Sequence, residues 1–187
     1  MNRHDLTSHI YTLDNFLTPE ACLAFIQQTE NLGYEPATIM TDHGPRLAEH
    51  VRNNNRVMFK DVALAEQLWQ RLGEQAPAPL SDSVAYGLNE LFRFYRYRPG
   101  QKFRKHRDAS YIKSATEGSL FTFMIYLNDD FTGGETTFNE IVVKPKTGSA
   151  LIFRHALEHE GTEVLTGVKY VLRTDIMFTL TKKTKSK

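Results

Sequence analysis

Two segments with alternating side chains constrain the fold of this chain more than any other feature. An alternation of period two places every second side chain on the same face of a strand. Residues 91–97 and 120–127 both show this alternation. The apolar sets are Phe92, Phe94, Phe121, Phe123 and Ile125, and the opposite sets are Arg93, Tyr95, Tyr97, Thr122, Met124 and Tyr126. The sequence therefore predicts strands in both segments.

Turn signals and further short strands follow these segments at regular intervals. The turn signals are Pro99-Gly100, Asn128-Asp129-Asp130, Gly133-Gly134 and Pro145-Lys146-Thr147-Gly148. The other expected strands are residues 136–138, 141–143, 150–153 and 168–180. Many short strands separated by turns are typical of a β sandwich or a jelly roll.

Two helices are expected before the strands. The first lies within residues 14–33, where Thr18 can cap its start and Gly33 can close it. The second runs over residues 62–72 and is capped by Asp61. Their position before the strands indicates that they support the β structure.

The 187 residues suit one compact domain with three parts. We expect a mostly helical support over residues 1–80, a β core over 88–180 and a basic tail over 181–187. Residues 34–60 are ambiguous. Within them, the segment 52–56 (Arg-Asn-Asn-Asn-Arg) is too polar for a core, which indicates a solvated loop, with a substrate-contacting segment as the alternative.

Composition narrows the classes of function and partner. Lys plus Arg (23) nearly balance Asp plus Glu (22), and no stripe of basic and aromatic residues is present, so nucleic acid is not expected as a partner. The single cysteine, Cys22, excludes an intramolecular disulfide and indicates a reducing compartment. No apolar run resembles a signal peptide or could span a bilayer, so we expect a cytoplasmic protein without a membrane partner. No feature indicates an oligomeric state.

The segment most informative about chemistry is His106-Arg107-Asp108. Residues i and i+2 of an extended segment share a face, so His106 and Asp108 can present an imidazole nitrogen and a carboxylate oxygen to one ion. A third ligand must come from elsewhere, and the candidate is His159, followed by Glu160 and Gly161. Two histidines and one carboxylate form the facial triad of non-haem Fe(II) oxygenases.

From about Leu91 to Phe178 the chain resembles the Fe(II)- and 2-oxoglutarate-dependent dioxygenases, in their prolyl 4-hydroxylase-like branch. Several separate pieces match in the family's order. They are Tyr97-Arg98-Pro99-Gly100-Gln101, His106-Arg107-Asp108, Tyr126-Leu127-Asn128, Gly133-Gly134-Glu135-Thr136-Thr137-Phe138, Pro145 to Phe153, and His159-Glu160-Gly161 through Gly167-Val168-Lys169. The match covers about half of the chain and does not include residues 1–80.

The resemblance implies a mainly β protein with flanking helices, built as a double-stranded β-helix, the jelly-roll or cupin-like fold. It implies that His106, Asp108 and His159 bind Fe(II) near one open end of the barrel. His155 is the rival for the third position. The family pattern has a glycine two residues after the distal ligand and a basic residue ten after it, which His159 satisfies and His155 does not.

The resemblance also implies which residues contact the cosubstrate 2-oxoglutarate, whose far carboxylate needs a buried cation. Lys169 lies where members of this branch place a lysine. Arg173 faces the same side of the strand and is the alternative. Tyr97 and Tyr126 match positions that hydrogen-bond this ligand, with simple core packing as the alternative for each.

The implied enzyme is a non-haem iron dioxygenase that hydroxylates an unactivated C–H bond. It would consume O2 and 2-oxoglutarate and release succinate and CO2, with ascorbate as a further candidate cofactor. We expect a prolyl residue of a protein or peptide as substrate. The alternatives are a free amino acid or other small molecule, or a sensor that binds metal and 2-oxoglutarate without turnover. Four basic residues near the expected mouth could attract an acidic peptide, and a solvated rim is the simpler explanation for them. They are Arg93, Arg104, Lys105 and Arg107.

Overall fold

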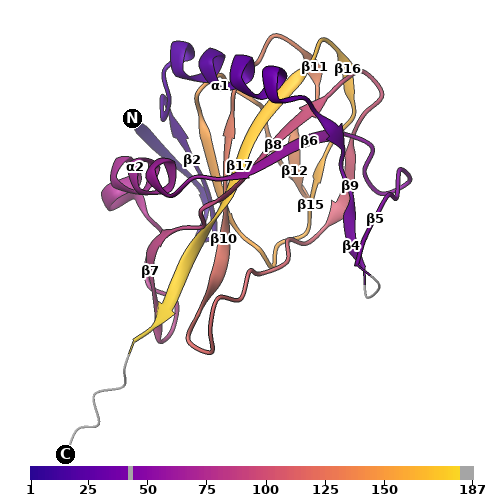
Figure 1. Ribbon diagram of the computed structural model, residues 1–187. Coiled ribbons are helices and arrows are strands. Elements are labelled where there is room, and N and C mark those ends of the chain that lie inside the picture. Colours follow the sequence, from indigo (N-terminus) through magenta and orange to yellow (C-terminus); the bar gives the residue numbers. More distant parts are fainter. Residues whose placement is uncertain (42–43, 182–187) are drawn as a thin grey trace, which may run out of the picture.

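The longest strand, β17 (Lys169–Leu180), organises the structure, which is a computed structural model (Figure 1). It pairs antiparallel with β10 (Glu117–Tyr126) along one side. Along its other side it pairs first with β8 (Leu91–Tyr97) and then with β7 (Ser83–Leu88). The long strands expected over residues 91–97, 120–127 and 168–180 are therefore confirmed, and they form the middle of one sheet.

The structure describes residues 1–41 and 44–181. Within the ambiguous segment 34–60, Asp42-His43-Gly44-Pro45 has the composition of a turn or loop. Two of its residues, Asp42 and His43, lie outside the described residues. So does the basic tail beyond Thr181. None of the helices in the described ranges is long and apolar enough to cross a membrane.

Two sheets face each other in the described part of the chain. The main sheet has nine strands, in the order β1-β2-β14-β10-β17-β8-β6-β3 with β7 beside β17, and the minor sheet has four, in the order β13-β12-β15-β9. The further main-sheet strands are β1 (Asn2–Thr7), β2 (Ile10–Asp14), β14 (Ala150–Arg154), β6 (Asn55–Lys60) and β3 (Glu35–Pro36). The minor-sheet strands are β13 (Ile141–Val143), β12 (Thr136–Phe138), β15 (His159–Gly161) and β9 (Phe103–His106). Two small pairs, β4 (Ile39–Thr41) with β5 (Gly44–Arg46) and β11 (Thr132–Gly133) with β16 (Val164–Thr166), complete the strands.

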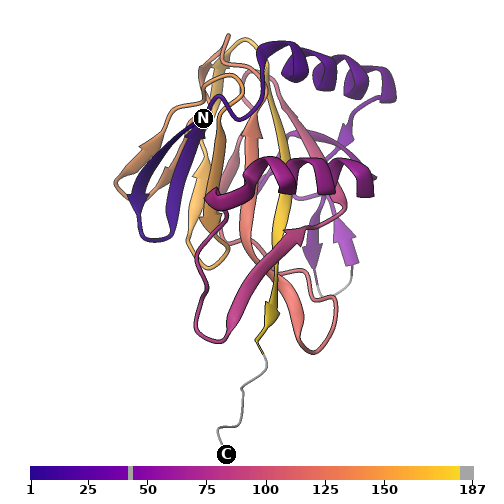
Figure 2. The ribbon, with the colours of Figure 1, turned by 90° about the vertical axis from the view of Figure 1, so that its left-hand side faces the viewer.

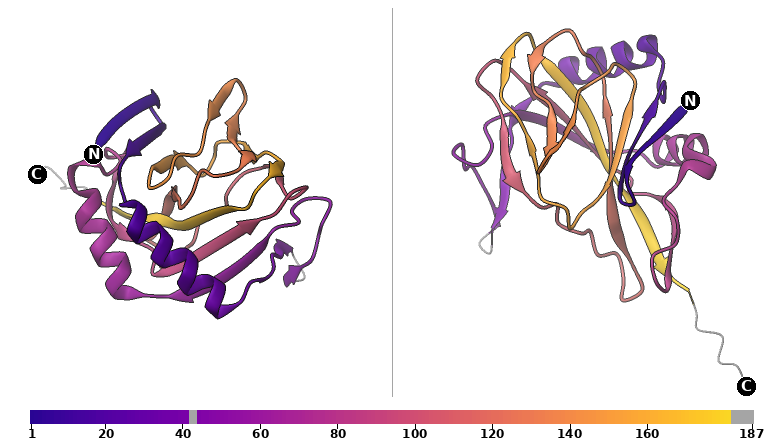
Figure 3. Two further views of the ribbon diagram at one scale, coloured as in Figure 1. Left: turned by 90° about the horizontal axis from the view of Figure 1, so that it is seen from above. Right: turned by 180° about the vertical axis from the view of Figure 1, so that it is seen from behind.

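The helices and the minor sheet cover opposite faces of the main sheet. Seen from above, α1 (Pro19–Leu32) and α2 (Val62–Leu72) lie on one side and the minor sheet on the other (Figure 3). Figure 2 shows α2 in front of the main sheet and α1 along its upper edge, and a short 3-10 turn, η1 (Gly73–Gln75), follows α2. This arrangement is the double-stranded β-helix with flanking helices that the sequence predicts.

The alternating side chains separate two hydrophobic cores. Phe92 and Phe94 pack with residues of both helices, and the apolar set of β10 joins them. Tyr95 and Tyr97 point the other way, into the space between the two sheets, where they join Tyr126 and residues of the minor sheet. Both faces of β8 are covered, and its side chains alternate between them. Its aromatic residues therefore enter either the core beneath the helices or the interior between the two sheets.

Both helices have the caps that the sequence predicts. Thr18 accepts a hydrogen bond from the backbone N–H of Ala21 at 3.2 Å, and Asp61 accepts one from that of Leu64 at 2.9 Å. Gly33 ends α1 with a positive φ of 83°. The first helix begins at Pro19, directly after Thr18, whereas Asp14, at the start of the range in which the helix was expected, ends β2.

The expectation of a mostly helical segment over residues 1–80 differs from the structure. β2 pairs with β14, and β6 pairs with β8, so strands from this segment extend the main sheet on both sides. Their pairing partners lie far away in the sequence, and such non-local pairing leaves little local signal.

The solvated loop expected over residues 52–56 is also wrong. Arg52 and Asn54 are 5% and 1% exposed, and residues 55 and 56 begin β6. The guanidinium of Arg52 lies 4.1 Å from the ring centroid of Phe103 and 4.7 Å from that of Tyr95, and its Nε donates to Asn54. Aromatic faces and an amide oxygen thus replace the water that a buried arginine loses.

Candidate metal centre

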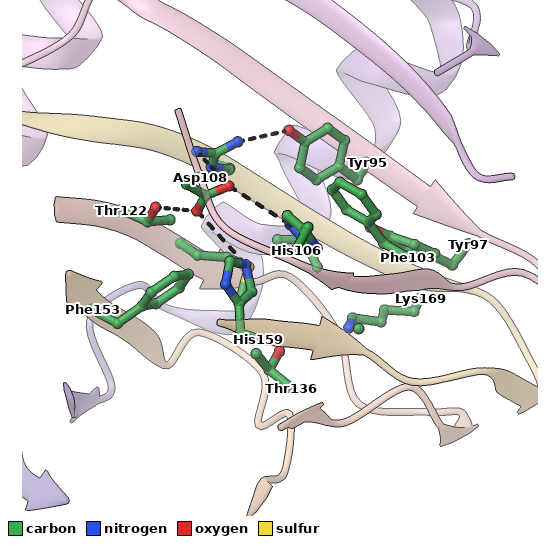
Figure 4. Close-up of a pocket in the computed structure, with 14 residues that line it drawn as sticks. Tyr95, Tyr97, Phe103, His106, Asp108, Thr122, Thr136, Phe153, His159 and Lys169 are labelled. Atoms are coloured by element: carbon green, nitrogen blue, oxygen red, sulfur yellow. Dashed lines mark hydrogen bonds and ion pairs between the residues drawn. The ribbon is translucent and has the colours of Figure 1, made fainter. Parts of the chain in front are cut away.

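Three potential metal ligands meet at the inner side of the minor sheet (Figure 4). His106 ends β9, His159 begins β15, and the two are direct partners across the antiparallel pair. Asp108 follows two residues after His106. Its Oδ1 lies 3.7 Å from His106 Nε2 and its Oδ2 lies 3.7 Å from His159 Nε2. All three ligand atoms lie within 4.8 Å of one another, so one ion could contact them together.

Backbone carbonyls fix the orientation of both imidazoles. His106 Nδ1 lies 2.7 Å from the carbonyl oxygen of Arg104, and His159 Nδ1 lies 3.1 Å from that of Leu157. A carbonyl only accepts, so each Nδ1 carries the hydrogen and each Nε2 keeps a lone pair facing the shared centre. Burial, with the neighbouring His159, lowers the pKa of His106 to about 4, and burial also lowers the pKa of His159. Both rings are therefore neutral near pH 7, as metal ligation requires.

The Asp108 carboxylate is held on both oxygens. Burial opposes its ionisation, but Arg173, His159 and the hydroxyl of Thr122 together hold its pKa well below the usual range. Arg173 Nη2 lies 3.0 Å from Oδ1, and Thr122 donates its hydroxyl hydrogen to Oδ2. Two neutral imidazoles and one ionised carboxylate form a donor set that suits Fe(II).

His155 lies behind this centre rather than within it. Its Nδ1 is 3.0 Å from Thr122 Oγ1 and its Nε2 is 3.0 Å from Ser119 Oγ. Because Thr122 donates to Asp108, it accepts from the Nδ1–H of His155. The carbonyl of His155 also accepts a hydrogen bond from the backbone N–H of Asp108 at 3.2 Å. Both ring nitrogens of His155 are thus engaged by hydroxyl groups, and the residue supports Asp108 indirectly.

A pocket adjoins the three ligands, which form part of its lining. Lys169 lines it and is 3% exposed, and its Nζ donates to the carbonyl oxygen of Gly134 at 2.6 Å. The same Nζ lies 5.2 Å from the ring centroid of Tyr97 and 5.5 Å from that of Tyr126. Among the residues that the structure describes, Lys169 has no ion-pair partner. Burial lowers its pKa to about 7, and Glu135 opposes this shift.

Arg173 lines the same cavity but is already paired. Its Nη2 lies 3.0 Å from Asp108 and 3.2 Å from Asp175, and its Nη1 lies 3.4 Å from the hydroxyl of Tyr95. The two cations considered for the cosubstrate therefore differ in kind. Lys169 forms no ion pair with a described carboxylate, although Glu135 acts on it at longer range, whereas Arg173 lies between two carboxylates.

The two tyrosines expected at the site occupy different positions. Tyr97 lines the cavity. Tyr126 is fully buried, and its hydroxyl donates at 2.7 Å to Thr136, which does line the cavity. Tyr126 thus lies behind Thr136.

Tyr95 and Thr122 also line the pocket, although no motif in the sequence marks them as site residues. Their inward direction follows from the same alternation that orients Tyr97, which is the sequence signal for both. Of the four basic residues expected around the mouth, Arg104, Lys105 and Arg107 are exposed. Arg93 is instead partly buried and pairs with the buried Asp175 at 3.2 Å.

The chain is similar to a family model and to known proteins. Residues 92–174 match the family model described as the 2OG-Fe(II) oxygenase superfamily. A putative prolyl 4-hydroxylase of Acanthamoeba polyphaga mimivirus is 24% identical over 184 residues, which cover 86% of this chain and 71% of that protein. Prolyl 4-hydroxylase 1 of Arabidopsis thaliana is 28% identical over 189 residues, which cover 86% of this chain and 66% of that protein.

A solved structure shares the fold. It is a prolyl hydroxylase from Trichoplax adhaerens in complex with a peptide fragment of the hypoxia inducible factor oxygen degradation domain. It superposes with a TM-score of 0.66 at 16% identity, covering 97% of this chain and 89% of that one.

Proposed function

Because this chain belongs to the 2OG-Fe(II) oxygenase superfamily, in its prolyl 4-hydroxylase-like branch, we propose that it hydroxylates a prolyl residue of a protein or peptide. It is a 2-oxoglutarate-dependent dioxygenase that uses Fe(II), 2-oxoglutarate and O2. Bound iron supplies the oxidising chemistry, in which one oxygen atom of O2 enters the substrate as a hydroxyl group and the other enters succinate, with release of CO2. The observation that carries the proposal is the His106–Asp108–His159 cluster beside a buried unpaired lysine.

In this proposal His106, Asp108 and His159 hold the iron. Their fit is supported by the two Nε2 lone pairs directed at the shared centre and by the ionised carboxylate between them. The rings of Phe103 and Phe153 pack against the two histidines, with centroids 3.4 Å and 4.5 Å away. Aromatic packing of this kind limits the movement of both ligands and keeps water away from their outer faces.

Lys169 is proposed to bind the far carboxylate of 2-oxoglutarate. A buried ammonium without an ion-pair partner is unfavourable by itself. An anion that enters the cavity would therefore be attracted to the Lys169 ammonium without competition from a paired carboxylate. Arg173 is a weaker candidate, because Asp108 and Asp175 already share its guanidinium. Tyr97 lines the same part of the cavity and can contact the cosubstrate, and Tyr126 can act only through Thr136.

The affinity for 2-oxoglutarate should depend on pH through Lys169. Its pKa of about 7 without ligand means that, at higher pH, binding of a dianion must be accompanied by proton uptake. Affinity should therefore fall above pH 7, by up to about tenfold per pH unit. Of the groups facing the ammonium, Glu135 is an acid with a lowered pKa and the pKa values of Tyr97 and Tyr126 are raised, so none of them should titrate between pH 7 and 9.

Titration of 2-oxoglutarate into the metal-loaded protein at pH 6.5, 7.5 and 8.5 measures this dependence. Lys169→Arg is the control, because a guanidinium stays protonated throughout this range. A wild-type affinity that is constant across the three pH values would contradict the role given to Lys169.

The substrate assignment is supported by the relatives, two of which are named prolyl 4-hydroxylases, and by the structure of the Trichoplax adhaerens enzyme with a bound peptide. We expect proline-containing peptides to gain one oxygen atom, with one succinate formed for each hydroxyl group. Mass spectrometry of a peptide library, incubated with Fe(II) and 2-oxoglutarate, measures both.

Free proline in the same assay is the comparison for the peptides, and Asp108→Ala is the control for the enzyme. If free proline gained oxygen and no peptide did, the substrate would be a small molecule rather than a peptide. Binding of iron and 2-oxoglutarate without succinate, even with cell extract added as a source of substrate, would favour a sensor.

A further inference from the structure

A chain of alternating charges runs from the barrel wall to the metal centre. Arg93 on β8 pairs with Asp175 on β17 at 3.2 Å, Asp175 pairs with Arg173 at 3.2 Å, and Arg173 pairs with Asp108 at 3.0 Å. Asn89 also donates to Asp175, at 3.3 Å. Two guanidiniums and two carboxylates give the ionised cluster no net charge, which makes its burial tolerable.

Arg173 is the member that reaches the metal centre. Its side chain is 13% exposed, and its fork is held at three points: the carboxylates of Asp108 and Asp175 and the hydroxyl of Tyr95. Because a guanidinium is planar and rigid, contacts at three points fix its orientation as well as its position.

The contact with Asp108 complements that of Thr122. Arg173 bonds Oδ1, and Thr122 bonds Oδ2, so the carboxylate cannot rotate without losing one of the two bonds. Asp108 lies outside the regular strands, two residues past the end of β9. The ladder of backbone hydrogen bonds therefore does not by itself hold this carboxylate in place.

We propose that Arg173 is a positioning residue, which holds the Asp108 carboxylate in the orientation needed for metal binding and does not bind 2-oxoglutarate. This inference rests on the proposed function, since Asp108 has an ion to hold only if the three ligands bind one. A lysine at this position could not replace the arginine, because one nitrogen would have to serve all three acceptors, which the guanidinium divides between Nη1 and Nη2.

The test is a titration of the metal-free protein with Co(II), an air-stable stand-in for Fe(II), followed by calorimetry and by the visible spectrum of the bound ion. Arg173→Gln and Arg173→Lys should both weaken Co(II) binding by about ten- to a hundredfold, the range seen when a supporting partner of a metal ligand is lost. Both should also change the intensity of the cobalt bands. At saturating Co(II), the affinity of both variants for 2-oxoglutarate should remain within about threefold of wild type, since neither variant removes a cosubstrate contact.

Arg96→Gln is the matched control. Arg96 lies on β8 and pairs with Glu30 at 2.8 Å, in a partly buried ion pair with no connection to Asp108. Its loss should lower thermal stability without changing Co(II) affinity. Should Arg173→Gln fail to fold, Asp175→Asn removes one anchor of Arg173 and leaves the contact with Asp108, and it should weaken Co(II) binding in the same direction by a smaller factor.

The outcomes separate the inference from the proposed function. Absence of Co(II) binding by folded wild type would refute the function itself. Wild-type Co(II) affinity in both Arg173 variants, or tighter binding after removal of the positive charge, would overturn the positioning role. Lost 2-oxoglutarate affinity with unchanged Co(II) affinity would instead make Arg173 a cosubstrate ligand.

Discussion

His159→Ala is expected to abolish succinate formation and to lower metal affinity by more than about a hundredfold, because losing a supporting residue alone costs ten- to a hundredfold. The Nε2 of His159 is one of the three atoms that converge on the centre, and no other described histidine lies close enough to replace it. Asp108→Ala should act in the same way and should also leave Arg173 without its partner at Oδ1. Calorimetric titration with Co(II) and a succinate assay with substrate peptide measure the two effects.

His155→Ala is the matched control for His159→Ala. It removes an equally buried imidazole four residues away, but one whose nitrogens face Thr122 and Ser119. We expect it to retain metal binding, weakened by about tenfold through the loss of support for Thr122. Equal loss of metal binding in the two variants would contradict the assignment of His159 as the third ligand. Loss of metal binding in His155→Ala alone would make His155 the third ligand instead.

Lys169→Met is expected to raise the dissociation constant for 2-oxoglutarate by about a hundredfold or more, because a buried carboxylate left without its cation loses several kcal/mol. Methionine has a similar length and fits the apolar walls, so the fold should tolerate it. Co(II) affinity should not change, since the ammonium makes no contact with the three ligands. Titration of 2-oxoglutarate into the metal-loaded variant measures the effect.

The Arg173 and Lys169 variants should therefore show opposite patterns. Arg173→Gln affects the metal and spares the cosubstrate, and Lys169→Met affects the cosubstrate and spares the metal. A Lys169→Met protein that binds 2-oxoglutarate as tightly as wild type would remove the lysine from the site. The far carboxylate would then need another cation.

Local patterns were sufficient for much of the fold and for bringing together two of the three proposed metal ligands. The alternation in residues 91–97 fixed which aromatic side chains enter the barrel, because both faces of β8 are covered. Capping residues marked the start of both helices and the end of the first one. The spacing of His106 and Asp108 placed two ligands together, since one short extended segment carries both.

Features that depend on contacts between segments distant in the sequence could not be predicted from local patterns. The strands β2 and β6 form because they pair with β14 and β8, and neither has a strong pattern of its own. Arg52 is buried because Tyr95 and Phe103 cover it, although its own neighbours in sequence are polar. The engagement of Arg173 with Asp108 requires β17 to pass beside the end of β9, which no local spacing reveals.

One titration decides whether the three ligands and Lys169 form a working site. Purified metal-free protein is titrated without oxygen, first with Fe(II) and then with 2-oxoglutarate, while the visible metal-to-ligand charge-transfer band is recorded. We predict that the band appears in wild type and in His155→Ala, is absent in His159→Ala, and needs a much higher 2-oxoglutarate concentration in Lys169→Met. A folded wild-type protein that shows no band at any concentration would contradict the proposed site and, with it, the hydroxylase function.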